Sequence, residues 1–285
     1  MISFILACSD DPLKQITECL DVTGRIEKEC EKNSKITLDL SRLEWILPCS
    51  ALILSNKISE VAGKGCAITF IKPEKPQVKN YLESVGFPLG GVGTNATYMP
   101  IHHFSRKKGE DSTKIIEKEM EEIYSVVEKN LPSELSSGIY YLLGELSDNI
   151  DQHSNFTIVS IMVQYYKKKG HIDIGVLDNG ETIPGVFEKN GIKFERDEEA
   201  IKMALQGIST KEGEIGRGKG LITSKRLVQK GLNGEFFILS RKGFVKAVGE
   251  KTIFNELGGR SFKGTLIYMR FSDPRKGLNI YKYVE

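Results

Sequence analysis

The helix predicted between Ser133 and Ile150 constrains the fold of this 285-residue chain more than any other stretch. A row of short polar side chains, Glu145, Asn149 and His153, runs along this helix at intervals of four residues. Long, solvated Lys or Arg side chains would be usual there. Because the apolar face of the helix is already complete, we expect the polar row to border a cleft. The apolar face consists of Leu135, Ile139, Leu142, Leu143, Leu146 and Ile150.

The oxygens of this row suit a hard divalent cation. Mg²⁺ keeps several waters in proteins and binds through one or two protein oxygens together with phosphates. Asn149 is therefore the candidate metal ligand. Glu145, one turn earlier, could orient or deprotonate a nucleophile beside a bound phosphate. An ordinary solvated helix face is the alternative, and the row alone does not exclude it.

The rest of the second half predicts a sheet covered by helices. Ile116, Met120, Ile123 and Val127 form one face of an amphipathic helix that ends near Pro132. A loop-rich, charged segment is expected from 180 to 216, followed by a helix from about 220 to 230. The predicted strands are 156–166 and 171–179, joined by the turn 167–170, then the hairpin 234–249 and a closing strand 264–271.

The first hundred residues alternate between strand and helix patterns, which predicts a small α/β domain. The strands are expected at 3–8, 35–40 and 66–71, and the helices at 12–32, 48–62 and 75–86. A Gly-rich and then basic stretch from 88 to 113 has no periodicity. We therefore divide the chain into a domain at 1–100, a linker at 101–112 and a domain at 113–285. His102 and His103 are expected to be exposed loop residues without other metal ligands nearby.

Bulk properties exclude several classes of function. A net charge of +2, from 40 basic and 38 acidic residues, gives no general attraction to nucleic acid. No apolar run approaches the roughly 18 residues of a membrane helix, and the first residues lack the basic leader of a signal peptide. The five cysteines contain no CxxC pair, so we expect buried free thiols in a reducing compartment, hence the cytoplasm.

A carboxylate lies at the end of an apolar strand in "VLDNGETIP". There, Asp178 could accept a hydrogen bond from an exocyclic amine. Gly180, two residues later, would let a planar ring approach the backbone.

A glycine-rich loop, "GRGKGL", leads into the helix predicted from 220. Gly216, Gly218 and Gly220 leave backbone N–H groups unhindered at a helix N-terminus, which is an anion-binding arrangement. No GxxxxGK[ST] sequence occurs, and the loop follows a charged segment rather than a strand, so neither a P-loop nor a dinucleotide fold is indicated. Downstream, Gly264 and Thr265 open the last strand.

These four stretches, in this order, resemble the motifs of the GHKL ATPase superfamily, over about residues 112 to 272. The resemblance implies a Bergerat-type α/β sandwich with a mixed sheet backed by helices, and it implies ATP and Mg²⁺ as ligands. It makes Glu145 the general base and Asn149 the Mg²⁺ ligand, and places Asp178 on the adenine amine. The remaining nucleotide contacts would come from His153, Gly180, Gly216, Arg217, Gly218, Lys219, Gly220, Leu221 and Thr265, with Lys211, Arg217 and Lys219 on or near a lid.

The sequence also departs from the usual motifs. Thr182 stands where the second motif carries its last glycine, and Lys219 stands where sensor kinases carry Leu. The helix from Thr113 to Asn130 has no phosphoacceptor histidine, which argues against an autophosphorylating sensor kinase. The E-x-x-x-N-x-x-x-H form is closer to the serine kinases that act as anti-sigma factors.

The N-terminal half is similar to the STAS domains of anti-anti-sigma factors, through "LDLSRLEWILPCSALIL". The likeness aligns the phosphorylated serine of that family with Cys49, so the phosphorylation site is expected to be lost. Ser50 is a neighbouring hydroxyl whose simpler role is to cap the following helix. A docking or dimerisation module is the better interpretation of this half.

Two hypotheses about function follow. The first is a Mg-dependent enzyme of bacterial-type regulation, hydrolysing ATP or phosphorylating a protein partner with Glu145 as base. The second is a nucleotide-gated switch or scaffold, in which ATP orders the lid and controls partner binding. Either one implies an adenine nucleotide and a protein partner, bound through the STAS-like domain or the lid. Homodimerisation is left open, and neither nucleic acid nor a membrane is expected.

Overall fold

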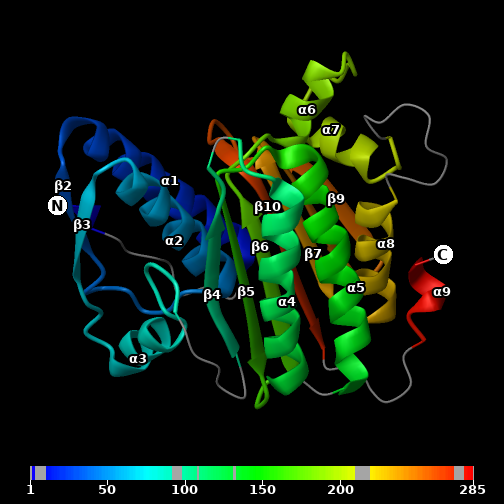
Figure 1. Cartoon of the computed structure of the whole chain (residues 1–285), viewed down its shortest axis with the longest axis horizontal. Helices are drawn as coiled ribbons and strands as arrows, with labels where there is room; N and C mark the ends of the chain where they lie inside the picture. The colour runs from blue at the N-terminus through cyan, green and yellow to red at the C-terminus, as the bar shows by residue number, and fades with distance from the viewer. Residues whose placement is uncertain are drawn as a thin grey trace.

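The protein is built in three layers around one large sheet (Figure 1). The computed structural model describes residues 2–3, 11–91, 98–107, 109–130, 133–208, 219–272 and 279–284. The N-terminal elements lie on one side of the large sheet, and the long helices of the second half lie on the other. The mixed α/β class predicted from the sequence is confirmed.

The large sheet has seven strands, and every pairing between them is antiparallel. The predicted mixed sheet is therefore wrong. The reason is that β5–β6, β7–β8 and β8–β9 are hairpins with short turns, and such turns can only join antiparallel strands. In spatial order the strands are β4 (Tyr98–Ser105), β5 (Ile158–Tyr166), β6 (His171–Asp178), β10 (Phe262–Ser272), β7 (Glu235–Arg241), β8 (Gly243–Val248) and β9 (Lys251–Glu256).

The N-terminal elements form a second, three-stranded parallel sheet with its own helices. Predicted segments that fall on described residues agree with the structure to within two residues. The strands are β1 (Ile2–Ser3), β2 (Lys35–Asp39) and β3 (Ala67–Ile71). The helices are α1 (Pro12–Lys32), α2 (Pro48–Gly63) and α3 (Pro76–Ser84).

The other face of the large sheet carries α4 (Ser112–Asn130), α5 (Ser133–Asn149) and α8 (Gly220–Arg226). A π-helical turn follows α5 at Ile150–Ser154, and another follows α8 at Leu227–Gly231. A short helix, α9 (Tyr281–Val284), ends the described chain. None of the helices in the described part of the chain is both long and apolar enough to span a membrane.

Two helices occupy the segment that was expected to be loop-rich. They are α6 (Ile183–Lys189) and α7 (Asp197–Ala204), at the top of the view in Figure 1. Thr182, the residue that departs from the expected motif, caps α6, since its Oγ1 accepts a hydrogen bond from Gly185 N at 3.0 Å. A proline in the first turn fits the same start.

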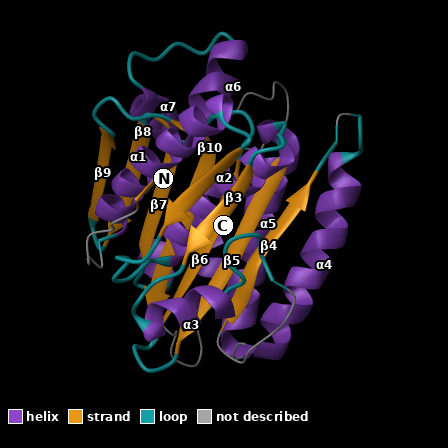
Figure 2. Cartoon of the chain, turned by 90° about the vertical axis from the view of Figure 1, so that its left-hand side faces the viewer, coloured by secondary structure: helices purple, strands orange, loops and turns teal. Residues whose placement is uncertain are grey.

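Alternation along the strands divides the interior into two large cores. On β6, Ile172, Ile174 and Val176 face the helices, whereas Asp173 and Leu177 face the N-terminal layer. Residues 11–91 therefore share one core with the second face of the sheet and cover it (Figure 2). The buried sheet residues in that shared core are Ile101, Met162, Leu177, Phe237, Leu239, Phe244, Leu266 and Tyr268.

The predicted linker differs from what the structure shows. Its first five residues belong to β4, which pairs with β5 at the edge of the large sheet. His103 is half-buried there, with Nδ1 2.7 Å from Ser160 Oγ and Nε2 2.8 Å from Ser55 Oγ. Burial lowers its pKa to about 4. His102 Nε2 lies 2.7 Å from a carboxylate oxygen of Glu119. The expectation of two exposed loop histidines is wrong.

The cysteines follow the prediction only in part. Cys19 and Cys49 are free and buried, as expected. Cys30 and Cys66 form a disulfide, because the end of α1 and the residue before β3 bring their Cα atoms to 5.7 Å. The free-thiol prediction is wrong for these two, and Cys8 lies outside the described residues. Cysteine usage therefore gives no argument for a reducing compartment.

Candidate functional site

A cavity of about 110 Å³ lies between the large sheet and the helices on its α5 side. It exceeds the roughly 10–15 Å³ that one water needs, so it has room for part of an organic ligand. Its walls are apolar, with a few polar groups, as in small-molecule sites. The lining residues are Leu146, Asn149, Ile150, Ser154, Val176, Asp178, Glu181, Ile183, Val186, Phe187, Ala204, Ile208, Leu221, Thr265 and Ile267.

Asp178 ends β6 and is almost fully buried in the cavity wall, directly opposite Thr265 on β10. Burial raises the pKa of its carboxyl to about 7, although Gly180 N donates a hydrogen bond to Oδ1 at 2.9 Å. A buried carboxyl at a strand end can receive a hydrogen bond from a ligand.

The packing of the turn after β6 requires a glycine at position 180. A Cβ at this position would lie 1.9 Å from the carbonyl oxygen of Ser154. That carbonyl also accepts a short hydrogen bond from Glu181 N. The glycine thus lets the turn after β6 pack against the end of the π-helical turn. Its expected role, making room for a planar ligand, stays a prediction.

Asn149 lines the cavity from the last residue of α5. Its Nδ2 donates to the carbonyl oxygen of Glu145 at 2.7 Å. This hydrogen bond involves the amide nitrogen of Asn149, which cannot bind a cation. The side-chain oxygen, Oδ1, is the atom that could bind one.

Glu145 is not among the residues that line the cavity. Its carboxylate lies against the start of α8, where a Cβ on Gly220 would be 2.1 Å from Oε2. Burial raises the pKa of Glu145, while a hydrogen bond with Tyr141 opposes this shift. A raised pKa suits a general base, but the carboxylate points to the α5–α8 contact rather than into the cavity.

The polar row does not continue past Asn149 in α-helical register. The backbone changes to a π-helical turn at Ile150–Ser154, so His153 is not placed by the four-residue spacing. The side chain of His153 lies outside the described residues. Ser154, at the end of the same turn, is buried and lines the cavity instead.

The glycine-rich loop is described only from its end. Lys219 is exposed, Gly220 begins α8 and Leu221 reaches the cavity. Lys211, Gly216, Arg217 and Gly218 lie outside the described residues. The structure therefore gathers Asn149, Asp178, Thr265 and Leu221 at one cavity.

Sequence reasoning missed the residues of α6 and the turn before it, namely Glu181, Ile183, Val186 and Phe187. The signal was present in "ETIPGVFEKNG", which has a capping Thr, a Pro in the first turn and a Gly after the end. Ser240 was also missed. It is fully buried, and its Oγ is 3.0 Å from Thr265 Oγ1.

A second group of potential ligands shares no residue with the cavity. The ligand atoms of His102, Glu119 and Glu122, on β4 and α4, lie within 4.8 Å of one another. The hydrogen bond between His102 and Glu119 already uses two of them.

The positions aligned with the STAS phosphoacceptor are buried. Cys49 and Ser50, at the start of α2, have no exposed surface. Cys49 lies near Asp173 and Arg270, on the sheet face opposite the cavity, and burial raises the pKa of its thiol to about 12. In this arrangement neither side chain can reach a nucleotide bound in the cavity.

Comparison with known proteins adds no relative to this description. No protein-family model matches the sequence, and no curated protein matches it.

Proposed function

We propose that the chain is a Mg-dependent, ATP-binding protein of the GHKL type, and that it hydrolyses ATP or transfers phosphate to a protein partner. One observation carries the proposal. Asn149, Asp178, Leu221 and Thr265 come from four separate segments of the sequence, and all four line one cavity. Those segments are the ones whose motifs resemble the superfamily.

The chemistry of the cavity suits an adenine base. The Asp178 carboxyl can accept from the exocyclic amine, whereas guanine carries a carbonyl there, so ATP should bind better than GTP. Apolar side chains such as Val186 and Ile267 would contact the ring faces. Asn149 would hold Mg²⁺, which would neutralise phosphate charge near the start of α8.

A nucleotide-gated switch is the second candidate. It is favoured by the position of Glu145, which lies against Gly220 and outside the set of cavity residues. In that arrangement a nucleotide could bind and control partner binding without a placed general base.

We further propose that any phosphoacceptor is a separate protein. Ser50 is fully buried, and Cys49 faces away from the cavity. Incubation with γ-labelled ATP and Mg²⁺ separates the alternatives. Label in free phosphate indicates an ATPase, label in an added protein indicates a kinase, and label that stays in ATP indicates a switch.

Calorimetry with Mg-ADP tests nucleotide binding itself. Asp178→Asn should weaken binding by about 1–3 kcal/mol, since the ligand then meets a mismatched buried polar group. Asp148→Asn is the matched control, because Asp148 is exposed on α5 and does not line the cavity. Equal affinity in the Asp178 variant and the parent would remove Asp178 from the site.

A further inference from the structure

An arginine occupies a position where the backbone favours glycine. Arg241 and Lys242 form the turn between β7 and β8, in which Ser240 pairs with Gly243. Arg241 has a φ of +57°, the left-handed conformation required at the first central residue of such a turn. For a residue with a Cβ this conformation is strained. The side chain must therefore make contacts that offset the strain.

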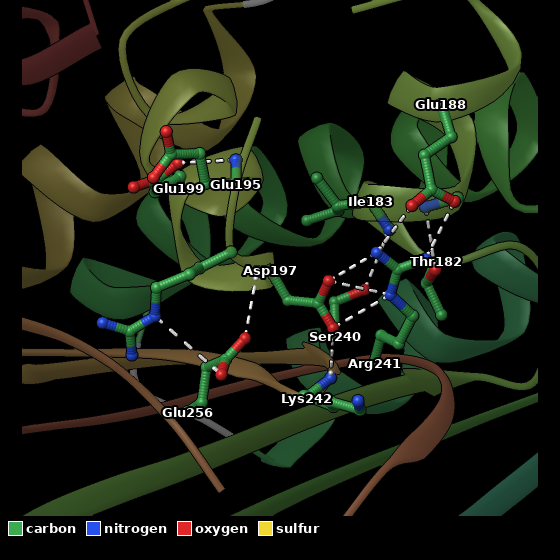
Figure 3. A network of polar contacts seen from close by, with 12 residues as sticks. Thr182, Ile183, Glu188, Glu195, Asp197, Glu199, Ser240, Arg241, Lys242 and Glu256 are labelled. Carbon is green, nitrogen blue, oxygen red and sulfur yellow. Dashed lines mark hydrogen bonds and ion pairs between the residues drawn. The ribbon is translucent and has the colours of Figure 1, made fainter. Parts of the chain in front are cut away.

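Arg241 binds two carboxylates from two different helices (Figure 3). Its Nε lies 2.9 Å from each carboxylate oxygen of Asp197, the first residue of α7. Its Nη1 and Nη2 each donate to one oxygen of Glu188, on α6, at 2.8 Å. The guanidinium also lies 5.8 Å from the ring of Phe194, between the two helices. A forked arginine–carboxylate contact fixes orientation as well as distance.

The same two helices form the outer wall of the cavity. Ile183, Val186 and Phe187 from α6 and Ala204 from α7 line it. Phe187 belongs to a small third cluster, whose other buried members are Ala200 and Ala204. Helix α7 also buries Ile201 in the large core on this side of the sheet, whereas α6 buries Pro184 and Phe187. The α6 part of the wall therefore depends more on polar anchors, because regions with few buried apolar contacts open at low free energy.

The rest of the turn fits the two helices closely. A Cβ on Gly243 would lie 2.5 Å from Glu198 N, so the start of α7 rests on the turn. Lys242 N donates to Asp197 Oδ2 at 3.0 Å. Ser240 Oγ accepts from Ile183 N at 2.9 Å, at the start of α6, and also contacts the cavity residue Thr265.

We propose that Arg241 is a positioning residue, which clamps α6 and α7 onto the β7–β8 turn and so holds the outer wall of the cavity in its binding geometry. The clamp is an inference about the fold. Its effect on affinity rests on the proposed nucleotide site.

The test uses Arg241→Gly in the full chain, because glycine suits the backbone at this position and removes only the side chain. Arg241→Lys keeps the charge without the fork. Arg260→Ala is the matched control, since Arg260 forms a similar two-bond contact with Asp21 but does not line the cavity. Hydrogen exchange of residues 183–208 and Mg-ADP affinity are measured for each.

In Arg241→Gly, we expect the amides of 183–208 to exchange about tenfold faster or more, with those of 158–178 unchanged. Mg-ADP affinity should fall about 5- to 20-fold. Arg241→Lys should lie between this variant and the parent, and Arg260→Ala should match the parent. Unchanged exchange in 183–208 would overturn the clamp, as would parent-like affinity despite faster exchange. If the parent binds no adenine nucleotide, the proposed function fails, and hydrogen exchange alone decides whether Arg241 clamps the wall.

Discussion

Burial of the Asp178 carboxyl lowers the stability of the folded protein. Its pKa is about 7 in the folded chain, whereas an aspartate in an unfolded chain has a pKa near 3.8. Between about pH 4 and pH 7 the folded protein therefore holds more protons than the unfolded one. The contribution of Asp178 to the free energy of unfolding falls as pH rises through this window and is constant above it.

Asp178→Asn should accordingly raise the stability of the unliganded protein. The amide oxygen can still accept from Gly180 N, but it has no charge to desolvate. We expect the free energy of unfolding to rise on the order of 2 kcal/mol at pH 8, with a smaller gain at pH 5. Urea denaturation at both pH values measures this. A gain that does not depend on pH would contradict the raised pKa.

The Glu145→Ala variant distinguishes the enzyme hypothesis from the switch hypothesis. If Glu145 is the general base, nucleotide still binds but turnover falls by roughly 10²–10⁴. If the chain is a switch, turnover in the parent is already negligible, and the variant changes affinity only slightly. Single-turnover assays with labelled ATP, combined with calorimetry, distinguish these outcomes. A parent that binds Mg-ATP tightly but neither hydrolyses it nor labels any protein rules out the enzyme.

Three residues from motifs that fix both residue type and spacing line one cavity, and their roles stay predictions. Asn149, Asp178 and Thr265 all reach the cavity. The packing requirement for Gly180 could not be predicted from the sequence. The Ser154 carbonyl that excludes a Cβ there belongs to a different element. Nor could Arg241 be identified, since nothing in the sequence shows which carboxylates a turn arginine will meet.

At the scale of elements, the close approach of α2 to the large sheet depends on one small residue. Gly175, in the middle of β6, faces Leu52 of α2, and a Cβ there would lie 3.0 Å from Leu52 Cδ2. Leu52 is fully buried and so has little room to move.

Gly175→Val should force α2 away from the sheet. We expect the free energy of unfolding to fall by about 1–3 kcal/mol, as for other overpacked cores. Gly24→Ala is the comparison, because no atom lies near a Cβ at that position in α1, and alanine should be neutral or up to about 1 kcal/mol stabilising there. Chemical denaturation of both variants gives the answer. A Val variant as stable as the parent would mean that α2 does not pack tightly here.

Helices and strands with a clear hydrophobic periodicity were predicted well from the sequence. The direction in which the strands pair within the large sheet was not. The amphipathic helix at 112–130 and the hairpin at 234–249 each carry their own signal. Strand direction within the sheet depends on which strands become neighbours. In this sheet β10 lies between β6 and β7, although it begins more than 80 residues after the end of β6. The short helices α6 and α7 were missed because their charged surfaces resemble a loop.

At the scale of the whole molecule, the two predicted domains share one core. Removing the N-terminal layer would uncover a face of the sheet that carries Met162, Leu177, Phe237 and Tyr268. A chain that begins at residue 113 would also lack the whole of β4, which forms one edge of that sheet.

A chain restricted to residues 113–285 should therefore not behave as a folded monomer. We expect strong binding of a hydrophobic dye and self-association, because an exposed apolar sheet face of this kind promotes aggregation. Light scattering and dye fluorescence, compared with the full chain, measure both effects. A monomeric fragment that unfolds cooperatively would show that residues 113–285 form an independent domain.

The shared core also orders events during synthesis. Helix α2, which is buried along most of its length, leaves the ribosome before the strands that it covers have been translated. Its last sheet partners on β10 are made about 200 residues later, a delay of roughly 10–40 s at ordinary elongation rates. Throughout that interval the nascent chain presents an apolar helix without its final contacts, so the newly made N-terminal half is exposed to aggregation until the sheet is complete.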